Sequence, residues 1–172
     1  MADLSESVRR FFLAAALTVC AVLVGNAQER PGPALDLGAA WIGFADDGVV
    51  SEGAIDGAVR WYLSPRVALG PELLYIRGDN HGHLALTGNL TWDLLPEASR
   101  PAATPFLVVG AGMFQTRETF SVGNFTSTEG AFTAGGGVRS RLGNRVSAGV
   151  DARVGWELHV RVGGFVAIRL GH

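Results

Sequence analysis

Apolar and polar residues alternate most clearly over residues 145–170 of this chain. Within 146–156 every second residue is apolar, and the residues between them are charged, polar or glycine. After a short interruption, a second alternating run covers 160–170. Because side chains of a β-strand point to its two faces in turn, this pattern predicts two strands, each with one apolar face and one face that carries charge.

The same alternation predicts six earlier strands, separated by turn-forming residues. The expected strands are residues 34–44, 53–63, 66–76, 84–94, 105–115 and 128–142. The strand over 105–115 is apolar on both faces, so its pattern does not fix which side chains share a face. Segments 45–53, 77–83 and 115–128 are expected to be loops. The fold class predicted is all-β, an eight-stranded antiparallel up-and-down barrel.

The apolar face could meet either lipid or a protein core. The mean hydropathy of +0.24 is high for a soluble domain, but no apolar run reaches the roughly 20 residues that a membrane-spanning helix needs. A transmembrane barrel turns its apolar face outward to lipid and its polar face inward. The alternative is a soluble, lipocalin-like barrel with the apolar face inside, where it would form a core or bind an apolar ligand.

The tryptophans favour the membrane arrangement. All four are expected on the apolar face near strand ends, two toward the short turns and two toward the loops. They are Trp41, Trp61, Trp92 and Trp156. Two levels of tryptophan would bracket an apolar band as an aromatic girdle. The alternative is that they form the core of a soluble barrel.

The opposite face collects acidic residues and arginines. These are Asp36, Asp56, Arg60, Glu72, Asp93, Arg139, Arg141, Asp151, Arg153, Arg161 and Arg169. An eight-stranded barrel is narrow enough for its side chains to fill it, and an isolated buried ion is costly. We therefore expect a lumen charge network in which Arg–carboxylate pairs plug the barrel.

Residues 1–27 are predicted to be a cleaved signal peptide, followed by the barrel over 28–172. Arg9 and Arg10 precede an apolar segment over 11–25, and Gly25 and Ala27 supply small residues before the expected cleavage site. An uncleaved membrane anchor is the alternative. Cys20, the single cysteine, lies in this segment, so the mature chain is expected to have no disulfide or thiol chemistry.

The signal peptide, the eight alternating strands and the closing sequence ARVGWELHVRVGGFVAIRL together resemble the small outer-membrane β-barrel domain family. This family is the OmpA/OmpX-like group of eight-stranded, porin-family barrels of Gram-negative bacteria. The resemblance implies an outer-membrane location and a structural, adhesion, defence or channel role, and it brings no shared catalytic residues. Members usually end on an aromatic residue, whereas this chain ends on His172.

The expected function is structural or interactive. We expect a monomer in outer-membrane lipid whose loops meet an extracellular ligand or a cell-surface partner. The formal net charge of −2 gives no case for nucleic acid. No enzyme activity and no catalytic, cofactor-binding or metal-binding residues are predicted, because no glycine-rich phosphate loop precedes a helix and His81, His83 and Asp79 make a weak ligand set. A small-solute channel and the lipocalin-like binder are the alternative functions.

Overall fold

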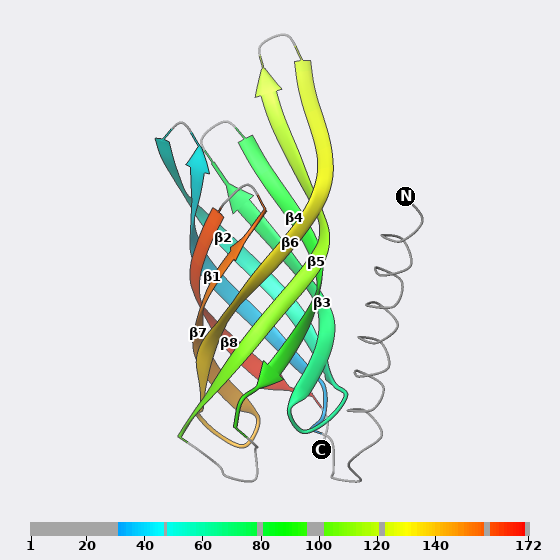
Figure 1. Ribbon diagram of the computed structural model, residues 1–172, viewed down its shortest axis with the longest axis vertical. Coiled ribbons are helices and arrows are strands. Elements are labelled where there is room, and N and C mark those ends of the chain that lie inside the picture. The colour runs from blue at the N-terminus through cyan, green and yellow to red at the C-terminus, as the bar shows by residue number, and fades with distance from the viewer. Residues whose placement is uncertain are drawn as a thin grey trace, which may run out of the picture.

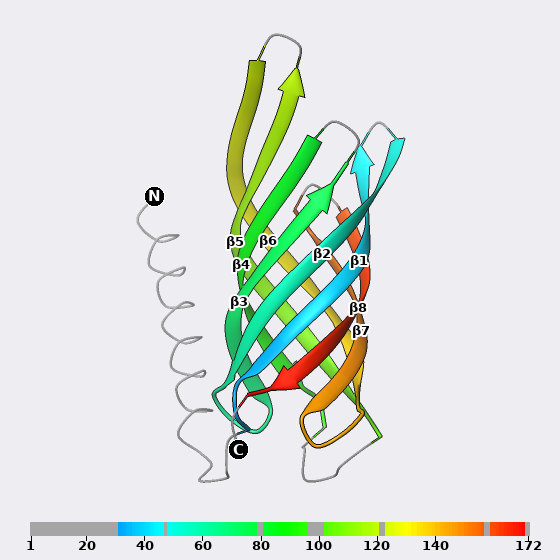
Figure 2. The same ribbon diagram turned by 180° about the vertical axis from the view of Figure 1, so that it is seen from behind.

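Eight antiparallel strands form a closed barrel in the computed structural model, which describes residues 31–46, 48–78, 81–95, 102–120, 123–156 and 159–170 (Figures 1 and 2). The strands are β1 (Ala34–Asp46), β2 (Gly48–Tyr62), β3 (Val67–Arg77), β4 (His81–Asp93), β5 (Ala103–Phe120), β6 (Gly123–Arg141), β7 (Val146–Gly155) and β8 (His159–Arg169). Each strand pairs with the next, and β8 closes the barrel against β1. The predicted fold class is confirmed. The predicted signal peptide lies outside the described residues.

The strands extend further at one end of the barrel than the alternation predicted. The pairs of β1 and β2 run up to Asp46 with Gly48, β3 ends at Arg77 and β4 begins at His81. The pairs of β5 and β6 run up to Phe120 with Gly123. The predicted loops 45–53, 77–83 and 115–128 are therefore wrong, because these segments are mostly paired strand. Backbone pairing needs no apolar alternation, and the threonines of the β5–β6 hairpin favour strands, so the pattern fades before the pairing ends.

The outer wall of the barrel is apolar over most of its height. Large hydrophobic side chains are exposed on every strand, as with Leu86, whose exposed fraction is 47%. In β5, Leu107, Val109 and Met113 point outward while Phe106 and Phe114 are buried in the lumen, which fixes the register that the sequence left open. Soluble monomers rarely expose an apolar surface of this extent. Among the described residues, no helix is long and apolar enough to cross a membrane.

Three of the four tryptophans lie on the outer wall. Trp41, Trp61 and Trp92 are 45%, 50% and 51% exposed. Trp156 is a correction, because its side chain is only 6% exposed and belongs to the interior cluster. Strand β7 ends at Gly155, so Trp156 stands at the start of the turn, where the alternation of a strand no longer sets the direction of a side chain.

Candidate functional site: the lumen and the β5–β6 hairpin

The centre of the lumen is built around one glutamate. Glu72, on β3, accepts hydrogen bonds from Nη1 of Arg153 on β7 at 2.8 Å and from Nη1 of Arg161 on β8 at 2.6 Å. Asn89, on β4, donates its amide N–H to the same carboxylate at 2.9 Å. All four side chains are buried. Strands distant in the sequence thus meet at Glu72 because the barrel closes around it.

Both arginines bind a second carboxylate. Arg153 donates to Oδ2 of Asp151 from Nε at 2.9 Å and from Nη2 at 2.7 Å. Arg161 donates from Nη2 to Oδ1 of Asp56 at 2.8 Å. Each guanidinium therefore faces two acids, and each acid faces at least one guanidinium, which is the arrangement that makes buried charge tolerable.

Two further ion pairs lie toward the end of the barrel where β1 begins and β8 ends. Arg60 donates to Asp36 at 2.8 Å, and Arg139 pairs with Asp93. The hydroxyl oxygen of Tyr62 lies between the two arginines and accepts from Arg60 at 3.3 Å and from Arg139 at 3.5 Å. Nine of the predicted charges are thus brought together, five in the network around Glu72 and four in these two ion pairs. The other two, Arg141 and Arg169, lie at the mouth, where Arg141 is exposed and Arg169 is half-buried.

Small residues make room for aromatic rings beside these charges. A Cβ added to Gly137 would lie 2.8 Å from the ring of Phe106, and one added to Gly149 would lie 2.6 Å from the ring of Phe165. The two rings meet edge to face with their centroids 6.0 Å apart. Inward-facing glycine therefore lets a narrow barrel hold rings as well as ion pairs.

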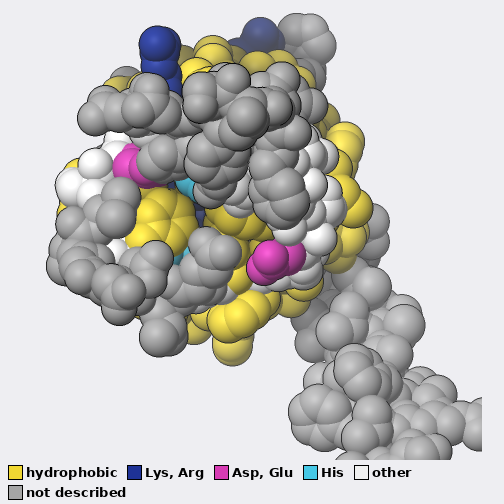
Figure 3. Space-filling model, turned by 90° about the horizontal axis from the view of Figure 1, so that it is seen from above, with side chains coloured by type: hydrophobic (Ala, Val, Ile, Leu, Met, Phe, Trp, Pro, Cys, Tyr) yellow, Lys and Arg dark blue, Asp and Glu magenta, His cyan; other side chains and the backbone are white. Residues whose placement is uncertain are grey.

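A second, apolar layer lies in the lumen on the other side of the charge network. It consists of Ile42, Phe44, Ala54, Leu74, Ile76, Ala85, Phe114, Ala131 and Trp156. Trp156 packs on Phe114 with centroids 5.1 Å apart and on His159 at 4.1 Å. Seen from above, hydrophobic side chains occupy the middle of this mouth (Figure 3). The alternation along the chain does not predict this layer, although apolar residues at inward positions near the strand ends, such as Ile42 and Ile76, carry its signal.

The hairpin of β5 and β6 stands beyond the other hairpins at this end (Figure 1). Outward-facing residues on it change from apolar to polar above Met113 and Phe132, where Gln115, Thr126 and Thr128 follow. Strand β6 pairs with β5 from Gly123 to Ser140 but with β7 only from Thr133 onward. Among the described strands, residues 123–132 of β6 therefore have no neighbour on the β7 side.

No group of three or more histidine, cysteine or acidic side chains in the described ranges is arranged to hold a metal ion. His83 instead stacks on Phe114 with an interplanar angle of 13°. Asp79, which the sequence placed near His83, lies outside the described residues.

Comparisons with known proteins agree with this geometry. A family model described as outer membrane protein beta-barrel domain matches residues 12–164. No curated protein sequence matches the chain. Among solved structures, Neisserial surface protein A is similar with a TM-score of 0.72 at 9% identity, over 83% of this chain and 100% of that one. The N-terminal β-barrel domain of OprF from Pseudomonas aeruginosa has a TM-score of 0.65 at 10% identity, over 83% and 100%. Ail, the attachment invasion locus protein of Yersinia pestis, solved with the heparin analogue sucrose octasulfate, has a TM-score of 0.56 at 12% identity, over 82% and 99%.

Proposed function

Because the chain belongs to the outer membrane protein β-barrel domain family, we propose that it is a closed, monomeric barrel that holds the β5–β6 hairpin outside the outer membrane, where the free edge of β6 binds a partner polypeptide. In this proposal the outer wall contacts lipid, the lumen is closed, and the edge of β6 binds the partner. The single observation that carries the binding role is the unpaired edge of β6 over residues 123–132.

The height of the apolar wall supports contact with lipid. On β4 and just beyond it, the outward side chains from Leu84 to Leu94 are apolar or glycine. Ten residue steps cover about 34 Å along a strand, or about 26 Å along the barrel axis at a tilt of roughly 40°. The apolar band of outer-membrane barrels is about 25 Å tall. Trp61 and Trp92 lie near one boundary of this band and Trp41 near the other, as membrane-interface tryptophans do.

The closed lumen makes the channel function a poor fit. The Glu72 network and the apolar layer around Phe114 lie one above the other across the bore. We expect the barrel to show no ion conductance in a planar lipid bilayer, because an ion would have to cross both layers. Steady conductance that changes when Arg153 is replaced with glutamine would contradict this part of the proposal and favour the channel.

The free edge of β6 suits strand addition. An unpaired strand exposes a row of backbone N–H and C=O groups, and an extended peptide binds them by adding a strand to the sheet. Proteins commonly protect such an edge with lysine, proline or a bulge, but residues 123–132 contain neither lysine nor proline and pair with β5 in continuous register. The start of β1, the end of β8 and the short turns lie at the other end of the barrel, and short turns mark the periplasmic side in this family of folds.

A variant that lacks the projecting part of the hairpin tests the binding role. Residues 116–127 would be replaced by Asn-Gly, a two-residue hairpin turn, which joins the paired residues Gln115 and Thr128. Peptides selected from a random library on the intact barrel in lipid nanodiscs are expected to bind this variant at least about tenfold more weakly, because they have lost their main-chain partners. Hydrogen exchange is expected to slow in β6 when such a peptide binds.

The double substitution Thr126→Ala with Thr128→Ala provides the matched control. It removes exposed hydroxyl groups from the same hairpin but keeps its backbone, so peptide binding is expected to stay within about threefold if main-chain pairing dominates. Equal binding to the intact and shortened barrels would show that the β6 edge is not the binding surface.

A further inference from the structure

The projecting β5–β6 hairpin is open to a further strand on the side where its neighbour ends first. On the β5 side, β4 continues the pairing up to His81 opposite Glu118. On the β6 side, β7 pairs only up to Gly155 opposite Thr133. A strand added to β6 would therefore continue the line of β7. We expect it to run antiparallel to β6, as β7 does, because antiparallel pairing is the slightly more stable kind.

The outward face of this edge has open space over Gly130. Gly130 pairs with Met113 of β5 and lies two residues before Phe132 on the same face of β6. The side chains of Met113 and Phe132 are 54% and 61% exposed, and a Cβ added to Gly130 would meet nothing within 4 Å. A large apolar side chain opposite Gly130 on the added strand would therefore have room to pack between these two side chains.

An aromatic side chain fits this position better than an aliphatic one. The outward residues of the hairpin change from apolar to polar just above Met113 and Phe132, which places Gly130 at the edge of the apolar wall. Aromatic rings are favoured where a membrane meets water. An aromatic residue on a neighbouring strand also covers a glycine in a sheet, which supplies no side chain of its own.

The preceding residue of the edge presents a carboxylate on the other face. Glu129 is exposed and pairs with the uncharged Phe114 of β5. Among the described residues, its carboxylate accepts a hydrogen bond from Ser127 at 3.4 Å and forms no ion pair. Directly opposite residues of neighbouring strands are close enough for opposite charges to attract and for like charges to repel. The position opposite Glu129 on an added strand therefore favours lysine or arginine.

We propose that the partner segment at the β6 edge is an extended strand, antiparallel to β6, that carries an aromatic residue opposite Gly130 followed directly by lysine or arginine opposite Glu129. This proposal rests on the binding edge proposed above and specifies its partner. Adjacent residues of a strand point to opposite faces, so the ring and the basic group would each meet the face that fits it. The exposed Thr126 and Thr128 farther along the edge favour threonine in the residues that follow.

Two peptides that differ in one residue test this chemistry. The first is Val-Thr-Phe-Lys-Thr-Thr-Thr with blocked termini, and the second has glutamate in place of the lysine. Fluorescence anisotropy with the barrel in lipid nanodiscs at low ionic strength is expected to show about fivefold weaker binding of the glutamate peptide, because attraction to Glu129 becomes repulsion. Glu129→Lys is expected to reverse this preference. Alanine in place of the phenylalanine is expected to weaken binding several-fold.

Glu129→Gln and Gln115→Lys form a matched pair of variants, because each raises the charge of the hairpin by one. Gln115 lies on β5, one strand away from the edge, and pairs with Thr128. Glu129→Gln is expected to reduce the preference for the lysine peptide to within about twofold, whereas Gln115→Lys is expected to leave it near about fivefold. Equal effects of the two variants would show a general attraction to the hairpin and would overturn the cross-strand pair.

The shortened hairpin separates this proposal from the binding role on which it rests. Equal binding of both peptides to the intact barrel, with the same weakening when residues 116–127 are replaced, would overturn the partner chemistry and leave strand addition at β6 standing. Failure of the lysine peptide to bind, where peptides selected from the random library do bind, would also overturn it. If no peptide distinguished the intact barrel from the shortened one, the binding role would fall and this proposal with it.

Discussion

Replacing Glu72 with glutamine is expected to lower the free energy of unfolding by about 3–5 kcal/mol, the cost of removing one partner from a buried ion pair. Glu72 binds Arg153, Arg161 and Asn89 at once. Glutamine has nearly the same shape but no charge, so both guanidinium groups would lose the carboxylate that compensates their burial. Urea unfolding of the barrel in lipid vesicles, followed by tryptophan fluorescence, measures the change.

Glu129→Gln is the control for this substitution. Glu129 lies exposed on β6, where this strand pairs with β5 but not with β7, so the same chemical change there is expected to stay within about 0.5 kcal/mol, as surface substitutions usually do. If Glu72→Gln were equally mild, Glu72 would not be the centre of a buried ionic network, and the arrangement of the lumen described above would be wrong.

Replacing Leu86 with arginine is expected to cost about 2–4 kcal/mol of unfolding free energy, the penalty for arginine at the lipid-facing midplane of a barrel. Leu86 points outward near the middle of the apolar wall and pairs with Leu73 and Met113 on its two neighbouring strands. The same vesicle unfolding assay measures the loss, because the chains with leucine and with arginine at position 86 both unfold into water.

Gln115→Arg separates a lipid contact from a local packing effect. Gln115 follows Met113 on the outward face of β5, just above the apolar wall, and an arginine there is expected to cost about 0–1 kcal/mol, as it does near the membrane interface. If Leu86→Arg were as mild as Gln115→Arg, the wall at Leu86 would face water, and the soluble barrel would be the better description.

The alternation of apolar and polar residues predicts most of the fold. It depends only on the face of a strand on which a residue lies, so it places Leu86 and Glu72 on opposite faces of the wall without knowledge of the residues that they contact. It could not say that Glu72 meets Arg161, 89 residues later in the chain, because that contact depends on the register of every strand in the closed barrel. The ion pairs inside the lumen therefore follow from closure of the barrel and not from the alternation.

Two features of the structure differ from what the alternation along the chain predicts. Trp156 was expected on the outer wall because it continues the alternation of β7, but the strand ends one residue earlier and the ring turns into the lumen. The loops were overestimated because the signal was apolar alternation, which disappears once a hairpin leaves the apolar zone even though backbone pairing continues to Phe120. Strand pairing and burial are separate properties, and only burial leaves an apolar period in the sequence.

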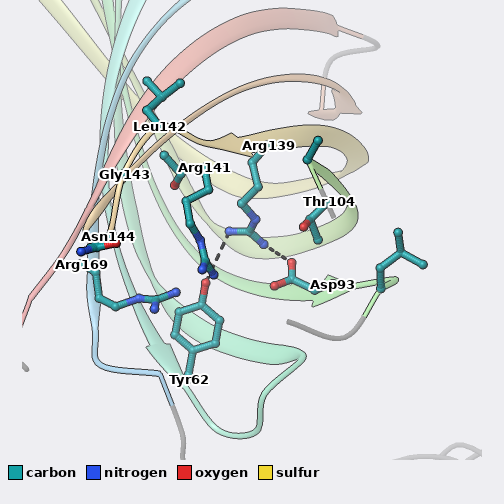
Figure 4. Close-up of a pocket in the computed structure, with 12 residues that line it drawn as sticks. Tyr62, Asp93, Thr104, Arg139, Arg141, Leu142, Gly143, Asn144 and Arg169 are labelled. Atoms are coloured by element: carbon teal, nitrogen blue, oxygen red, sulfur yellow. Dashed lines mark hydrogen bonds and ion pairs between the residues drawn. The ribbon is translucent and has the colours of Figure 1, made fainter. Parts of the chain in front are cut away.

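The described lumen has different chemistry at its two ends. Toward the β5–β6 hairpin, aromatic and aliphatic side chains around Phe114 lie in the bore, while at the end where β1 begins and β8 ends the bore opens into a cavity beside Tyr62 (Figure 4). The two ends of the lumen that we propose to be closed therefore present different surfaces.

Membrane fractionation followed by electrophoresis with and without boiling tests the central claim most directly. We expect the expressed protein in the outer-membrane fraction, with an unboiled band that migrates differently from the boiled one, because a closed barrel in lipid resists unfolding by detergent. A soluble periplasmic protein whose two bands coincide would contradict the membrane barrel, and the apolar face would then have to be assigned to a core or to an apolar ligand.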